Sequence, residues 1–370
     1  MRSTMWLAAT AGVALAAGMA QAQDAAVNMD ELVAAAQAEG MLTTVALPHD
    51  WCNYGAVIEG FKAKYPGIEV NELNPDAGSA DELEAIRANQ GNTGPQAPDV
   101  IDVGLSFGPQ AQAEGLIQPY KVSTWDTIPE DAKDPEGYWY GDYYGVMSFI
   151  VNTDLVDPVP ASFADLLKPD YAGQVALAGD PRASNQAILG VMAAGMAQGA
   201  EPGEAAATAG LGWFKQLNDA GNFVPVIGKA GTLAQGTTPI IVAWDYNALG
   251  WRDTLAGNPP VEVVVPSDAS LAGVYVQAIS AYAPHPNAAK LWMEYLYSDE
   301  GQLHWLSGYC HPIRFNDLVE RGVVPQEMMD KLPPAEAYDA AVFPTLDQVN
   351  ANSEAVKAGW DSTVGANVTE

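Results

Sequence analysis

The chain has 370 residues, a length that suits two domains of common size better than one core. Its 46 acidic and 16 basic residues give a formal net charge of −30, so nucleic acid is excluded as a partner. Charged residues make up only 17% of the chain, so the imbalance reflects scarce lysine and arginine and favours solubility rather than any one ligand.

Residues 1–22 have the pattern of a cleaved secretory signal. Arg2 precedes an apolar run over 6–19, and Ala-Gln-Ala at 20–22 supplies a small-x-small cleavage site. The apolar run is too short to span a bilayer, and no later stretch has the pattern of a transmembrane helix. We therefore expect a mature chain that begins near Gln23, is exported to the periplasm and does not insert into the membrane.

The first third of the mature chain alternates helices and strands. The predicted elements are, in order, a helix over 29–39, a strand over 42–47, a helix over 55–64, a strand over 68–73, a helix over 80–89 and a strand over 100–103. Such alternation predicts an α/β fold with a mostly parallel sheet. Ser79 and Glu82 have the spacing of a capping box at the second of these strand-following helices.

A domain crossing is predicted further along. An aromatic, proline-containing loop over 125–144 leads into an apolar strand over 145–152, and prolines then punctuate 157–160. The α/β pattern continues beyond it, with helices over 163–167, 204–220 and 246–256 and strands over 223–227, 239–244 and 261–265. The apolar stretch over 273–282 is predicted to cross back, and two helices over 286–306 are predicted to pack on the first domain.

A strand-turn-helix unit over 175–199 has the features of a ligand-binding turn. Its turn holds Gly179, Asp180 and Pro181, and the following helix begins with N–H groups that Ser184 or Asn185 can cap only in part. A small polar ligand could take the remaining N–H groups. The alternative is an ordinary capped turn with no ligand.

Four segments together resemble one family. They are PDVIDVGLSFGPQAQAEGLIQPY, YYGVMSFIVNTDLV, GDPRASNQA and NAAKLWMEYLYSDEGQ. In order and spacing they are similar to the periplasmic solute-binding proteins of bacterial ABC importers, in the branch that handles ferric iron, polyamines, thiamine and phosphonates. The resemblance implies a type II fold with two α/β lobes joined by two crossing strands. It also implies a monomer that holds a small-molecule solute between the lobes, closes about a hinge and is recognised by an inner-membrane ABC permease, with no cofactor, no metal and no catalysis.

The lobe boundaries follow from this resemblance and from the predicted crossings. The first lobe is expected to comprise 23–151 and 275–370, including the C-terminal helices, and the second lobe 152–274. Ligands of such open sheets bind in the crevice at the carboxyl ends of the strands.

Aromatic and polar residues in the loops after strands are candidates for the cationic end of a ligand. Trp51, Asn53 and Tyr54 follow the first strand, and their W-x-x-Y spacing is similar to the ring pair that flanks the amine in polyamine-binding members. The alternative is that these rings only fill the hinge. A second set follows a later strand, and a tyrosine lies on the return strand: Trp244, Asp245, Asn247 and Tyr275. Asp245 could instead be a helix cap.

The turn residues depart from the polyamine pattern. Polyamine-binding members have two carboxylates near this turn, whereas here Asp180 matches one and Ala183 stands at the other, with Arg182 between them. Arg182, together with Ser79 and Ser184 at helix starts, suits an acidic group such as a phosphonate or carboxylate. A zwitterionic amine reconciles both halves of the predicted site. The tandem Tyr143-Tyr144 lies at the crossing strand rather than later in the second lobe, which disfavours ferric iron.

One motif points to an enzyme. Residues 104–108 match G-x-S-x-G, which is typical of a hydrolase nucleophile elbow at Ser106. A secreted serine esterase would need an acid and then a histidine downstream, for which Asp245 with His285, His304 or His311 are the candidates. The resemblance instead gives Ser106 the role of a hydroxyl that faces the cleft.

Two cysteines, Cys52 and Cys310, complete the candidates. In an exported chain they can form one disulfide bond, whereas a zinc site needs more cysteine and histidine at closer spacing.

Overall fold

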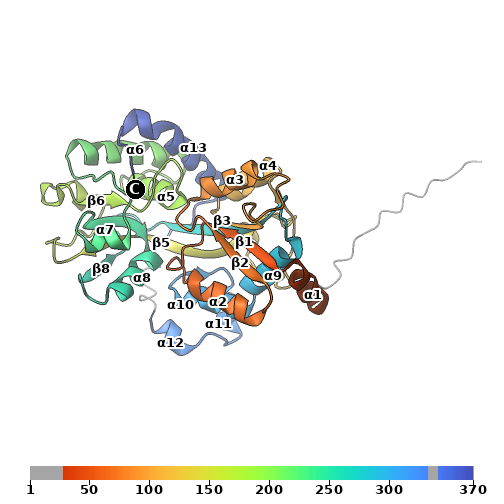
Figure 1. Ribbon diagram of the computed structural model, residues 1–370. Coiled ribbons are helices and arrows are strands. Elements are labelled where there is room, and N and C mark those ends of the chain that lie inside the picture. Colours follow the sequence, from red (N-terminus) through yellow and green to blue (C-terminus); the bar gives the residue numbers. More distant parts are fainter. Residues whose placement is uncertain (1–27, 332–340, 370) are drawn as a thin grey trace, which may run out of the picture.

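The computed structural model describes residues 28–331 and 341–369, so the predicted signal over 1–22 lies outside the described residues. Figure 1 shows two groups of helices and strands on either side of one long strand, β5 (Tyr140–Asn152). The predicted α/β class is confirmed. No helix in the described part of the chain is both long and apolar enough to cross a membrane.

The first group of elements is built mainly from the N-terminal third of the chain. It comprises α1 (Met29–Glu39), β1 (Met41–Val45), α2 (Tyr54–Lys64), β2 (Glu69–Leu73), α3 (Ser79–Ala88), β3 (Val100–Gly104), α4 (Phe107–Ala113) and β4 (Ile117–Gln118). Later elements complete it: β9 (Ala272–Ser280), α9 (Pro286–Leu296), α10 (Asp299–Ser307), β10 (His311–Pro312), α11 (Phe315–Glu320) and α12 (Gln326–Met329). As predicted, α9 and α10 pack on this lobe, where they contact α1 and α2.

The second group forms the other lobe. It comprises β6 (Val175–Leu177), α5 (Asn185–Met196), α6 (Glu204–Asp219), α7 (Ala230–Ala234), β7 (Ile240–Trp244), α8 (Asp245–Leu255) and β8 (Val261–Val264). The predicted short helix at its start is a 3-10 turn, η3 (Asp165–Leu167). The predicted strand over 223–227 forms only isolated bridges, at Phe223 and Val226, because Pro225 between them has no N–H to donate.

The sheet is mixed rather than mostly parallel. The order of the strands along the main sheet is β3-β9-β5-β7-β6, in which only β6 and β7 pair in parallel, and β1 and β2 form a separate parallel pair. β9 and β5 run antiparallel to their neighbours because they are the two strands that carry the chain between the lobes. The prediction of a mostly parallel sheet is therefore wrong at these crossing strands.

β5 changes partners in its middle. Residues 140–146 pair with β9, and residues 147–152 pair with β7 and β8. At the change, Gly145 lies opposite Gly273. A Cβ atom on Gly145 would come within 2.4 Å of the Tyr246 ring, and one on Gly273 within 2.2 Å of the Trp244 ring. Two bare glycines thus let aromatic rings from the start of α8 pack directly on the crossing strands.

The last helix of the chain packs on the second lobe. α13 (Leu346–Thr363) lies against α5 and α6 (Figure 1), with the Trp360 and Phe214 rings 5.5 Å apart. The expected first lobe included all of 275–370, and the structure differs there because the buried side of α13, which includes Val356 and Trp360, packs against α5 and α6. Before it, the backbone of Val342 pairs with Ser270 and Ala272, so a third segment runs beside the crossing strands.

Candidate functional site

A cleft of about 400 Å³ lies between the two lobes. The first lobe lines it with Asp50, Trp51, Asp76, Ser79, Asp81, Asp102 and Tyr275, and the second lobe with Asp180, Ser184, Asn185, Gln186, Lys229, Asn247 and Trp251. Its size is within the range of small-molecule sites. A Cβ atom on Gly104 would come within 2.0 Å of Asn185, so the two lobes are in contact at the end of β3.

A larger, shallower hollow of about 1210 Å³ lies elsewhere, beside α8, β8 and the segment 265–270. Its walls come mainly from the second lobe and the crossing segments. Of the predicted site residues it contains only Asp245. We therefore take the interlobe cleft as the candidate site.

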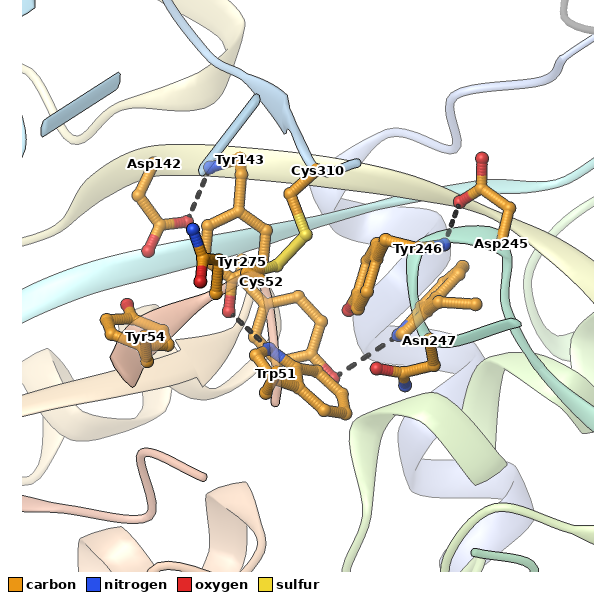
Figure 2. The surroundings of a disulfide bond; sticks show 12 residues. Trp51, Cys52, Tyr54, Asp142, Tyr143, Asp245, Tyr246, Asn247, Tyr275 and Cys310 are labelled. Atoms are coloured by element: carbon orange, nitrogen blue, oxygen red, sulfur yellow. Dashed lines mark hydrogen bonds between the residues drawn. A yellow bond between two sulfur atoms is a disulfide. The ribbon is translucent and has the colours of Figure 1, made fainter. Parts of the chain in front are cut away.

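Seven predicted residues line the interlobe cleft: Trp51, Ser79, Asp180, Ser184, Asn185, Asn247 and Tyr275. The Trp51 ring meets those of Tyr246 and Tyr275 edge-on, with centroids 5.3 and 5.5 Å apart (Figure 2). Its Nε1 donates to the Tyr143 hydroxyl at 2.7 Å. Trp51 therefore joins the cleft wall to β5.

Asn53 and Tyr54 lie outside the cleft lining, against the prediction. Asn53 precedes α2 in a left-handed backbone conformation and donates to the Ser307 hydroxyl at 2.8 Å. Tyr54 is fully buried and its hydroxyl accepts a hydrogen bond from Gln277. α2 begins at Tyr54, and the turn of the helix carries both side chains away from Trp51.

Arg182 also turns away from the cleft. Its guanidinium binds Asp180 through two nitrogens, at 2.9 and 2.7 Å, and reaches Asp361 on α13 and Asn367. The predicted anion-binding arginine is therefore already neutralised by carboxylates of this chain. Asp180 is neutralised in the same pair.

Trp244 and Asp245 belong to the core beside the crossing strands. Trp244 is fully buried, and its Nε1 lies 3.4 Å from the Tyr275 hydroxyl. Asp245 is buried and its Oδ1 accepts the Val146 N–H at 2.9 Å, on β5. The predicted cation box at these two residues is wrong, because they lie at the base of α8 and face β5 and β9 rather than the cleft.

Ser106 is buried just before α4, outside the cleft lining. The histidines named for an esterase have other neighbours. His285 Nδ1 lies 2.9 Å from Asp99, His304 lies beside Tyr295, and His311 stacks on Tyr144. Because Ser106 is not part of the cleft lining, the expectation that its hydroxyl faces the cleft is not supported either.

Several acidic residues of the cleft wall were not predicted from the sequence, and Asp102 is the most deeply buried of them. It lies within β3, is 6% exposed, and accepts the Tyr143 hydroxyl on Oδ2 at 2.7 Å. Its Oδ1 has no hydrogen-bond partner among the described residues. The signal that could have identified Asp102 was its carboxylate in the middle of the apolar run VIDVG. Carboxylates are rarely buried unless they are paired.

Two more buried carboxyl groups lie beside Asp102. Asp142 on β5 accepts the Gln277 amide at 2.9 Å, and Glu82 on α3 accepts the Asp102 N–H at 2.9 Å. Burial raises the pKa of Asp102 to about 6. Burial, with the nearby Asp102 carboxyl, raises the pKa of Asp142 and of Glu82 well above their usual ranges. We call Asp102, Asp142 and Glu82 the carboxyl cluster.

The predicted capping box at Ser79 and Glu82 is wrong. The N–H of Gly78, which precedes α3, is bonded to Asp81 Oδ2. Ser79 Oγ instead accepts the Gly104 N–H at 3.1 Å, and Glu82 accepts that of Asp102, so one face of α3 satisfies the open edge of β3. This contact holds the cleft end of β3 in place.

Replacing Ser79 is expected to weaken the fold. Ser79→Ala leaves the buried Gly104 N–H unpaired and should lower the free energy of unfolding by about 1 to 3 kcal/mol. Ser184→Ala is the matched control, because Ser184 makes no side-chain capping bond to α5, and it should change stability by less than about 0.5 kcal/mol. Urea unfolding of the two variants compares them. Equal losses would contradict the structural role of Ser79.

Cys52 and Cys310 form a disulfide bond, with Cα atoms 5.4 Å apart (Figure 2). It joins the start of α2 to the segment between α10 and β10, within the first lobe. Trp51 is the neighbour of Cys52, so the bond also fixes one wall of the cleft. No group of three or more His, Cys, Asp or Glu side chains suited to a metal is found in residues 28–331 and 341–369.

A family model described as bacterial extracellular solute-binding protein matches residues 96–340. The chain belongs to this family. An uncharacterized protein of Haemophilus influenzae is 30% identical over 66% of this chain and 70% of its own length, and iron uptake protein A2 of Synechocystis is 27% identical over 64% and 70%.

Solved structures of periplasmic binding proteins share the fold. The chain is similar to P5PA, with a TM-score of 0.68, 21% identity and coverage of 89% of this chain and 100% of that one. It is also similar to AfuA of Actinobacillus pleuropneumoniae, solved with fructose-6-phosphate, with a TM-score of 0.66, 20% identity and coverage of 88% and 98%. The type II binding-protein fold is thereby confirmed. As a member of this family, the protein binds a solute rather than catalysing a reaction.

Proposed function

We propose that this solute-binding protein is a monomeric periplasmic receptor for a small solute that carries an ammonium group, either a polyamine or a zwitterionic amine. The sequence pattern of a secretory signal over 1–22 supports export. Closure of the two lobes over the solute would create the surface that the inner-membrane permease recognises.

The charge of the cleft carries this proposal. Its first-lobe wall holds Asp50, Asp76, Asp81 and Asp102, and none of these pairs with a lysine, arginine or histidine in the described part of the chain. A cleft lined by carboxylates favours a cation. The rings of Trp51 and Tyr275 lie in the same wall and suit an ammonium group.

The second-lobe wall supports an acidic group at the other end of the solute. The N-terminus of α5 opens into the cleft at Ser184 and Asn185, without a side-chain capping bond from Ser184. Lys229, before α7, lines the same wall. A helix N-terminus favours an anion. These features favour a zwitterion over a polyamine. The second candidate is a phosphate or phosphonate ester, and the third is ferric iron.

Mass spectrometry of the small molecule released on denaturation tests the proposal, because closed clefts retain their solute. Thermal unfolding with added putrescine, 4-aminobutyrate, fructose-6-phosphate or ferric citrate provides the comparison. A solute at about 100 times its Kd stabilises the folded protein by about 2.7 kcal/mol. We expect an amine in the released fraction and a raised Tm with an amine. Stabilisation by the sugar phosphate or by ferric citrate, with no response to amines, would reject the proposed ligand class.

A further inference from the structure

We propose that Asp102 and Asn185 together seat the ammonium group of the solute, and that its binding expels a proton from the carboxyl cluster. This inference rests on the proposed function, since it assumes a cationic group in the cleft. Beyond the proposed function, it names the side chains that hold the ammonium group and links binding of the solute to release of a proton.

The first observation is a pair of buried polar side chains whose polar atoms lack hydrogen-bond partners. Asp102, 6% exposed, and Asn185, 2% exposed, come from opposite lobes and line the same cleft. Asp102 Oδ1 and both polar atoms of the Asn185 amide have no hydrogen-bond partner among the described residues. Buried polar groups are nearly always paired, so these atoms point to a missing donor and acceptor.

The backbone brings the two side chains to one face of the sheet. Asn185 lies over Gly104, where any side chain would collide with it. Residues two apart on a strand share a face, so Asp102 lies on the same face of β3 as the place that Asn185 occupies. Tyr275 pairs with Gly104 across the sheet, and the Asn185 amide lies beside its hydroxyl.

An ammonium group fits this arrangement. It has three donors, enough for Asp102 Oδ1 and the Asn185 carbonyl oxygen with one left over. The Trp51 and Tyr275 rings beside it supply faces or edges for the attached carbon atoms. An anion would meet the Asp102 carboxylate and be repelled.

The proton comes from the crowding of acids around Asp102. Each packed element contributes an acid or a phenol to its surroundings: Glu82 and Asp81 from α3, Tyr54 from α2, Asp142 and Tyr143 from β5, Tyr275 from β9, Tyr246 from α8 and Tyr297 after α9. None of these groups is a cation. Three carboxyl groups buried together cannot all ionise without a counter-charge, so at least one keeps its proton in the empty cleft.

The bound ammonium group supplies the counter-charge. The protonated Asp102 carboxyl group loses its proton to solvent, and the resulting carboxylate pairs with the ammonium group, so one positive charge enters as one leaves. At pH values below about 6, where Asp102 is protonated in the empty protein, the solute must displace this proton. Affinity should then fall by up to about tenfold for each unit of pH. Above that pH the affinity should be constant.

Isothermal titration calorimetry with putrescine and with 4-aminobutyrate tests the inference in the whole mature protein. Titrations at pH 5, 6, 7 and 8, each in two buffers of different ionisation enthalpy, count the protons released. We expect nearly one proton per solute at pH 5 and nearly none at pH 8. This measurement needs no variant, so it does not depend on any substitution folding.

Asp102→Asn should fold, since it keeps the shape of the side chain, and should bind the amine at least tenfold more weakly at pH 8 with no proton release at pH 5. Asp76→Asn is the matched control, because it removes an exposed cleft carboxylate and should weaken binding while the proton release at pH 5 remains.

An amine that binds with no proton release, or with release unchanged in Asp102→Asn, would overturn the inference and leave the proposed function standing. No binding of either amine at pH 8, where Asp102 is ionised, would reject both.

Discussion

Trp244→Ala is expected to lower the free energy of unfolding of the ligand-free protein by about 3 to 5 kcal/mol. The Trp244 ring is fully buried and lies directly against the backbone of Gly273, so its removal leaves a cavity where β5 and β9 cross between the lobes. Its neighbour Tyr246, stacked on it with centroids 6.4 Å apart, cannot fill that space without leaving Gly145. Urea unfolding followed by circular dichroism measures the loss.

Trp51→Ala is the matched control, since Trp51 is half-buried in the cleft wall and loses a smaller contact area. We expect a loss of roughly 1 to 2 kcal/mol from that substitution, together with weaker solute binding. A Trp244→Ala protein with an unchanged Tm and reduced affinity would show that the indole lines the cleft after all.

Removal of the disulfide bond is expected to have an effect of similar size. Cys52 and Cys310 are 258 residues apart, so the chain-entropy model allows up to roughly 5 kcal/mol of stabilisation. Cys52→Ala with Cys310→Ala tests this without placing hydroxyl groups in the core. Urea unfolding should show the loss, and a reductant should destabilise the parent protein but not the double variant. Two free thiols in the denatured, unreduced parent would contradict the bond.

The sequence predicted the regular elements well where their pattern is local. The helices over 204–220 and 286–306 and the strand before Asp180 form close to the predicted bounds because amphipathic spacing and turn residues lie within the segments themselves. The first half of β5 was missed because Tyr, Gly and Asp over 140–144 have the composition of a loop, and only pairing with β9, more than 120 residues later, makes them a strand.

Side-chain direction in the cleft was harder to predict. Trp51, Ser184 and Asn185 line it, as expected from loops that follow strands. Arg182 does not, because its guanidinium pairs with Asp180 and reaches Asp361 on α13, 179 residues away, in a helix that was not predicted from the sequence. Asp102 was overlooked because an apolar strand was treated as core throughout, although its carboxylate stands where the strand reaches the cleft.

The place of β9 in the sheet also governs the order in which the chain can fold. β9 lies between β3 and β5, yet it is made after the whole of β6, β7 and β8. A growing or emerging chain therefore has no middle strand for its first lobe until about residue 280, whereas β5, β6, β7 and β8 are complete by residue 264. Such long-range pairing slows folding. β1 and β2 can pair with each other early, but β3 and β4 have no strand partner until β9 is made.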